Sequence, residues 1–128
     1  MTIFEVNIMM GEKMSGVEQR KEVRFPAHVL PEEYTTFSIL LSQGKTATVK
    51  TVDASRNGFG FTAHLSSDNF ILGSKIVLYP FGESRPVYGI IVYAQPILAD
   101  TRVGVILQHL GGYEKYVLEI DTLEKNKL

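Results

Sequence analysis

Two short polar motifs contain the residues of this chain that are best suited to bind an anionic ligand. The first is Arg20-Lys21-Glu22-Val23-Arg24, which has the pattern RxxxR. The second is Asp53-Ala54-Ser55-Arg56-Asn57-Gly58, which has the pattern DxSxxG. Both motifs concentrate groups that form hydrogen bonds with phosphates and with base edges.

The residue types of the two motifs predict a ligand that has both phosphate groups and guanine bases. The guanidinium groups of Arg20 and Arg24 can pair bidentately with phosphate oxygens or with guanine O6 and N7, and they can stack on a purine face. The carboxylate of Asp53 can accept hydrogen bonds from guanine N1–H and N2–H, and Ser55 adds a hydroxyl group. Gly58 permits a positive φ in the connection between two strands and lets the backbone approach the ligand closely.

Each motif also has an interpretation that involves no ligand. Two arginines at this spacing in a polar segment are usually solvated or paired with carboxylates. Asp, Ser, Asn and Gly all favour turns, so the second motif is first of all a good connection between strands. The occurrence of both motifs in one chain is what favours a binding site.

The composition indicates one globular domain and limits the kind of ligand. The 128 residues are 45% hydrophobic and 21% charged, which is enough to bury a single core. Thirteen Lys and Arg residues against fourteen Asp and Glu residues give a net charge of −1, so no global basic field favours nucleic acid and any anion site must be local. The absence of cysteine excludes disulfides, thiolate chemistry and cysteine metal sites.

No other set of residues predicts catalysis or a cofactor. His28, His64 and His109 stand singly, without the spacing of metal ligands, and no Ser/His/Asp set or spaced carboxylate pair is evident. We therefore expect no enzyme, no metal and no cofactor. Several aromatic residues on predicted strands could instead stack the bases of single-stranded nucleic acid, although alternation favours a place in the core. They are Phe59, Phe61, Tyr79, Tyr88 and Tyr93.

The pattern from residue 36 onward predicts a mainly all-β domain that ends in a helix. Strands are predicted at 37–42, 45–52, 59–65, 75–79, 87–95 and 102–110, separated by turn residues. Six strands at this spacing favour an antiparallel barrel or sandwich over a parallel α/β sheet, and the chain length favours a small closed barrel. After Gly111-Gly112, apolar residues recur at helical spacing, which predicts an amphipathic C-terminal α-helix that packs on the barrel.

The residues before Arg20 are predicted to lie outside the barrel. Residues 2–10 alternate as a short strand does, and 11–19 contain two glycines and little periodicity, as a linker does. We therefore divide the chain into an N-terminal segment and linker, 1–18, and a domain, 19–128. No signal peptide or membrane-spanning stretch is recognisable, so a cytoplasmic location without membrane insertion is expected.

The two motifs in this order, followed by six strands and a helix, resemble the PilZ domain family. The resemblance covers residues 19–124, and Tyr88-Gly89-Ile90-Ile91-Val92 and Arg102-Val103-Gly104-Val105-Ile106-Leu107 are similar to the last two strands of the family. The stretch 25–35 differs from the family, because the segment that leads to the first strand is longer here than is usual in the family. The resemblance implies a bacterial second-messenger receptor, a six-stranded β-barrel that binds cyclic diguanylate (c-di-GMP).

The resemblance also implies a role for each motif residue. Arg20 and Arg24 would hold phosphate and guanine from a loop that wraps the ligand, and Asp53, Ser55 and Gly58 would line the other side. Gln19 precedes the first arginine, at a position linked in the family to one ligand or an intercalated pair, and both stoichiometries stay open.

A signalling role requires a partner, because a receptor with no output domain in the chain can act only by changing its shape or its affinity for something else. We expect a protein partner, reached through a conformational change, and the oligomeric state stays open between a monomer and a homodimer. The rival hypothesis is a barrel of the same architecture that works as a ligand-independent protein adaptor.

Overall fold

The strands and the helix follow the predicted order along the chain. The structure is a computed structural model that describes residues 22–82 and 85–127, so Arg20 and the predicted N-terminal segment and linker, 1–18, lie outside the described residues. Within them, the strands are β1 (Phe25–Pro26), β2 (Thr36–Leu41), β3 (Thr46–Ala54), β4 (Gly58–Ala63), β5 (Lys75–Pro80), β6 (Val87–Ile97) and β7 (Asp100–Leu107), and α1 spans Tyr113–Lys127. Three short 3-10 helices complete the elements, η2 (Ala27–Val29), η3 (Glu32–Tyr34) and η4 (Ser67–Asn69).

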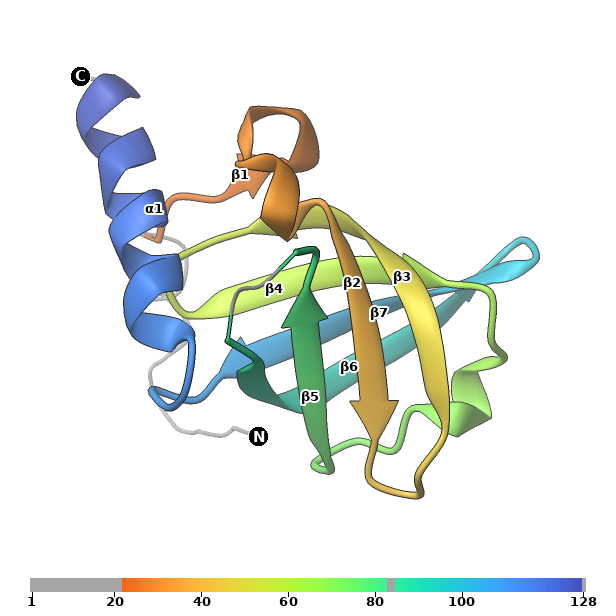
Figure 1. The fold of residues 1–128 in the computed structure, drawn as a ribbon. Helices are drawn as coiled ribbons and strands as arrows, with labels where there is room; N and C mark the ends of the chain where they lie inside the picture. The colour runs from red at the N-terminus through yellow and green to blue at the C-terminus, as the bar shows by residue number, and fades with distance from the viewer. Residues whose placement is uncertain (1–21, 83–84, 128) are drawn as a thin grey trace, which may run out of the picture.

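The strands form one closed antiparallel sheet (Figure 1). Their order is β1-β3-β2-β5-β6-β7-β4, and β4 also pairs with β3, which closes a barrel from β2 to β7. The predicted six-stranded antiparallel barrel with a C-terminal helix is therefore confirmed. The long approach at 25–35 contains η2, η3 and the extra strand β1, whose residue Phe25 pairs with Ala54 at the end of β3.

Alternation along the strands fills the barrel with apolar side chains. In β2, Phe37, Ile39 and Leu41 are buried, and Phe37 meets Phe59 of β4 edge to face with their ring centroids 4.6 Å apart. Phe59 and Phe61, which could have stacked nucleic-acid bases, are buried core residues. This removes two members of the predicted stacking platform.

The helix α1 stands at one end of the barrel, beside the turn between β3 and β4 (Figure 1). Its apolar residues Tyr116 and Ile120 are buried, as the predicted amphipathic period requires. The hydroxyl group of Tyr116 donates a 2.7 Å hydrogen bond to the backbone carbonyl of Ser55. Burial raises the pKa of Tyr116 well above its ordinary value, so this hydroxyl remains a donor. The helix is thus tied directly to the second motif.

No helix among residues 22–82 and 85–127 has the length and apolar character needed to cross a bilayer.

Candidate functional site

The DxSxxG motif spans the end of β3 and a tight turn into β4. The backbone N–H of Ser55 donates to the carbonyl of Gly58 at 2.8 Å, and the N–H of Gly58 donates to Ser55 Oγ at 3.1 Å. Asp53 lies within β3, opposite Pro26 and Gly60, because the strand continues to Ala54. The sequence pattern predicted that this strand ends at residue 52 and that Asp53 lies in the turn. The predicted boundary is wrong, since β3 ends at Ala54.

Gly58 is needed for space and not for a special backbone conformation. Gly58 does not use the positive φ that glycine permits, since among the described residues the glycines with positive φ are Gly44, Gly73, Gly82 and Gly111. A Cβ atom at Gly58 would lie 3.1 Å from Arg24 Nη1 and 3.2 Å from Ser55 Oγ. A side chain there would push against the guanidinium group, so the missing side chain of Gly58 leaves room for Arg24.

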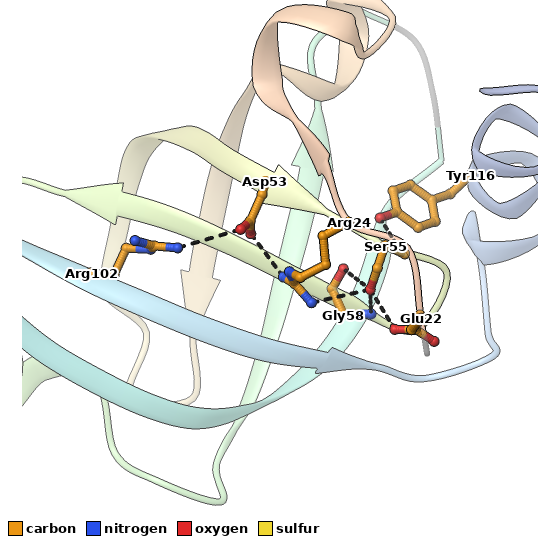
Figure 2. A network of polar contacts seen from close by, with 7 residues as sticks. All are labelled: Glu22, Arg24, Asp53, Ser55, Gly58, Arg102 and Tyr116. Carbon is orange, nitrogen blue, oxygen red and sulfur yellow. Dashed lines mark hydrogen bonds and ion pairs between the residues drawn. The ribbon is translucent and has the colours of Figure 1, made fainter. Parts of the chain in front are cut away.

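Arg24 reaches Asp53 and Ser55 of the second motif (Figure 2). Its Nη2 donates to Asp53 Oδ1 at 2.8 Å, and its Nη1 donates to Ser55 Oγ at 3.3 Å. The hydrogen bond to Asp53 raises the pKa of Arg24, while partial burial opposes it, so the group is a permanent cation. Its side chain is 45% exposed, which leaves part of the fork open to a ligand. The structure thus brings together four of the five predicted residues, and Arg20 lies outside the described residues.

Arg102 is a second cation at Asp53 that the motif analysis did not include. Its Nη2 lies 3.6 Å from Asp53 Oδ2, and its Nε is buried with no hydrogen-bond partner among the described residues. Arg102 projects from β7 across Gly60 of β4, where a Cβ atom would come within 2.7 Å of Asp53 Oδ1. Alternation in β7 could have marked Arg102 as outward-facing, but its position beside β3 depends on the closure of the barrel.

A shallow hollow of about 380 Å³ adjoins Arg24 on the outer face of the barrel. Gly58 and Gly104 contribute backbone without side chains, and a Cβ atom at Gly104 would overlap the ring of Tyr93. A register shift in β6 between Ile91 and Tyr93 turns Val92 and Tyr93 outward together, and both are more than 40% exposed. The hollow therefore offers an apolar, aromatic floor next to a cation, which is a combination that suits a purine base beside a phosphate.

Glu22 and Asn57 complete the polar network, and neither was singled out by the sequence analysis. Ser55 Oγ donates to Glu22 Oε1 at 2.5 Å, and Asn57 Nδ2 donates to Glu22 Oε2 at 2.9 Å. The other side of the Asn57 amide contacts the hydroxyl of Tyr113 at 3.1 Å and His109 Nε2 at 2.9 Å. These contacts extend the site from the RxxxR segment to the start of α1.

The histidines give no sign of a metal centre. His109 stacks on Tyr113 with their ring centroids 4.1 Å apart, and His64 Nδ1 lies 2.5 Å from Asp100 Oδ1. Across the described ranges, no group of three or more His, Cys, Asp or Glu residues could hold a metal ion. The contact with Asp100 accounts for His64, and stacking on Tyr113 and the contact with Asn57 account for His109.

Comparison with known proteins gives matches to solved structures alone. No protein-family model matches the sequence, and no curated protein matches it either. The structure of the MrkH–c-di-GMP complex from K. pneumonia matches with a TM-score of 0.57 at 14% identity, covering 85% of this chain and 55% of that one. The PilZ domain of YcgR from Escherichia coli, solved with c-di-GMP, matches with a TM-score of 0.57 at 13% identity over 85% of this chain and 94% of that one.

A longer structure of Escherichia coli YcgR in complex with c-di-GMP matches with a TM-score of 0.55 at 14% identity, covering 85% of this chain and 47% of that one. The chain thus spans about half the length of the MrkH chain and of the longer YcgR chain, but nearly all of the isolated PilZ domain. This chain therefore has the fold of a PilZ domain, as the resemblance of its motifs predicted.

Proposed function

We propose that this protein is a receptor for c-di-GMP, which it binds on the outer face of the barrel between the RxxxR segment and the turn from β3 to β4. The observation that supports this most directly is the convergence of Arg24 with Asp53 and Ser55, which are 29 and 31 residues away in the sequence. The solved structures of the same fold contain c-di-GMP, which makes this ligand the first to test.

Each motif residue has a role that its surroundings support. Arg24 offers the exposed part of its guanidinium group to a phosphate or to guanine O6 and N7. Asp53 accepts from guanine N1–H and N2–H, and Ser55 provides a hydroxyl group. Gly58 keeps the space beside Arg24 clear. Arg20, the first arginine of the RxxxR pattern, is proposed to contact phosphate and guanine together with Arg24.

The hollow beside Arg24 provides the place for a base. Tyr93 lies over the backbone of Gly104 with 41% of its surface exposed, so one ring face can stack on a purine. Stacking of a base on an aromatic ring contributes about 1–3 kcal/mol per base. A ligand that combines phosphates with guanines would use both the polar rim and this floor, whereas a free phosphate would use the rim alone.

Signalling is proposed to pass through α1 to a protein partner. Tyr116 binds the backbone of Ser55 and Tyr113 contacts Asn57, so any movement of the turn between β3 and β4 acts on the helix. The proposed receptor domain is 19–128, preceded by the segment and linker 1–18, and it performs no chemistry on the ligand. A cytoplasmic protein, either a monomer or a homodimer, fits this role.

Isothermal titration of the purified chain with c-di-GMP, cyclic diadenylate and GMP tests the proposal. We expect saturable binding of c-di-GMP and much weaker binding of GMP, because GMP lacks the second phosphate and the second base. Thermal unfolding with each nucleotide provides an independent measurement, since a ligand that binds the folded state raises its stability. No response to c-di-GMP from a well-folded protein would contradict the proposal.

One observation favours the alternative, a ligand-independent protein adaptor. Large apolar side chains are exposed in connections away from the hollow, with Leu72 at 64%, Phe81 at 63% and Leu98 fully exposed. An adaptor would bind its partner equally well with and without c-di-GMP, and Arg24→Ala would leave that binding unchanged. A receptor would bind its partner differently with and without c-di-GMP, and Arg24→Ala would change that binding.

A further inference from the structure

The candidate site contains an anion of its own, the carboxylate of Glu22. One of its oxygens accepts from Ser55 Oγ at 2.5 Å and the other accepts from Asn57 Nδ2 at 2.9 Å. Glu22 lines the hollow together with Arg24 and Asn57, and Figure 2 shows its carboxylate directed at Ser55. Two neutral donors and a nearby guanidinium group thus surround a single negative charge.

Tyr113 and His109 orient the side-chain amide of Asn57 so that its NH₂ group donates toward Glu22. The hydroxyl of Tyr113 donates to Asn57 Oδ1, and His109 Nε2 lies 2.9 Å from the same oxygen. Since that oxygen can only accept, His109 carries its proton on Nε2 and the NH₂ group of Asn57 faces Glu22. The stacked rings of His109 and Tyr113 fix this arrangement.

We propose that Asn57 Nδ2 and Ser55 Oγ form an anion cradle for which Glu22 competes with a phosphate of the ligand. This inference rests on the proposed function and adds two residues to it, Asn57 as a phosphate donor and Glu22 as an internal competitor. Carboxylate and phosphate oxygens accept from the same donors, and two anions repel each other at this distance, so only one can occupy the cradle. Glu22 is two residues from Arg24, so its departure would move the segment that holds Arg24.

An internal competitor lowers the measured affinity by the fraction of time for which it fills the cradle. Glu22→Gln keeps the size of the side chain and removes its charge, so the contacts with Ser55 and Asn57 weaken and the cradle opens. We expect Glu22→Gln to bind c-di-GMP about tenfold more tightly than the parent, the effect of losing roughly one charge-assisted hydrogen bond. Asn57→Ala should bind more weakly, because the ligand loses a donor.

The competition predicts a particular coupling between the two substitutions. In the parent, Asn57→Ala removes a contact from the ligand and also one from Glu22, so the two effects partly cancel. In the Glu22→Gln background the competitor is already weak, so Asn57→Ala should cost more affinity there than in the parent. Two residues with unrelated roles would give additive changes instead.

The experiment is titration of the full chain with c-di-GMP for the parent, Glu22→Gln, Asn57→Ala, the double variant and Glu32→Gln. Glu32 is an exposed carboxylate that does not line the hollow, so its replacement controls for the change in net charge. Tighter binding by Glu22→Gln but not by Glu32→Gln, with the stated coupling, is the expected result. Equal or weaker binding by Glu22→Gln while the parent binds would overturn the competition and leave the proposed function intact.

Two further outcomes are informative. If Glu22→Gln binds c-di-GMP and the parent does not, both the proposed function and the competition are supported. If neither the parent nor any variant binds c-di-GMP, both the proposed function and the competition are overturned. If Glu22→Gln fails to fold, NMR of the parent decides the matter through the side-chain amide of Asn57. Its resonances should shift on saturation with c-di-GMP, and unchanged resonances at saturation would refute the cradle.

Discussion

Replacing Arg24 with Ala should weaken ligand binding while leaving the barrel folded. The substitution deletes the guanidinium group that donates to Asp53 and Ser55 and that borders the hollow. In the proposed complex the same group contacts a phosphate or a guanine. The two consequences, for stability and for affinity, have different expected sizes, and the difference is what makes the substitution a useful test.

The effect on stability should be small. The pair is partly solvated, with Arg24 45% exposed and Asp53 25% exposed, and exposed ion pairs contribute about 0–1 kcal/mol. Asp53 also keeps Arg102 at 3.6 Å, so its carboxylate is not left without a cation. We therefore expect the free energy of unfolding to fall by less than about 1 kcal/mol.

The effect on affinity should be larger, because a hydrogen bond to a charged group contributes about 1.5–3 kcal/mol to binding. This corresponds to a loss of roughly ten- to hundredfold in the affinity for c-di-GMP. Arg24→Lys keeps the charge but loses the planar fork, so it should recover only part of the loss. Arg20→Ala should behave as Arg24→Ala does.

Isothermal titration measures the affinity, and urea unfolding measures the stability of the same preparations. Arg56→Ala is the matched control, because Arg56 lies in the turn between β3 and β4 that Arg24 contacts, but it pairs with Asp121 of α1 and does not line the hollow. It should bind c-di-GMP as the parent does. Unchanged binding by Arg24→Ala, or a barrel that unfolds when Arg24 is replaced, would refute the assigned role.

Three further predictions concern other parts of the site. Asp53→Ala should weaken binding of c-di-GMP more than that of cyclic diadenylate, which lacks the N1–H and N2–H donors; equal losses in titration would mean that Asp53 only shapes the strand. Tyr116→Phe should destabilise the fold by about 1–3 kcal/mol in thermal or urea unfolding, because the buried carbonyl of Ser55 loses its donor; an unchanged midpoint would show that the bond contributes nothing. Gly104→Ala should displace the ring of Tyr93, which a Cβ atom would overlap, and weaken c-di-GMP binding without unfolding the barrel; unaltered affinity would remove Tyr93 from the site.

Local patterns in the sequence were sufficient for the order of the elements. Alternation over six short runs marks the strands because successive side chains of a strand point to opposite faces, and the barrel buries one of these faces. The recurrence of Tyr113, Tyr116 and Ile120 marks α1 because residues at helical spacing share one side of the helix. The two motifs also identified the family fold, since their residue types and order are visible without coordinates.

Tertiary structure alone decided how the site is assembled. Asp53 lies in β3 and not in a turn because Pro26 and Gly60 pair with it from both sides. Arg102 reaches Asp53 only because β7 pairs with β4 and β4 pairs with β3, and Glu22 meets Asn57 from 35 residues away. These contacts depend on closure of the barrel, which is driven by the summed burial of its core, so no local preference of the residues involved predicts them.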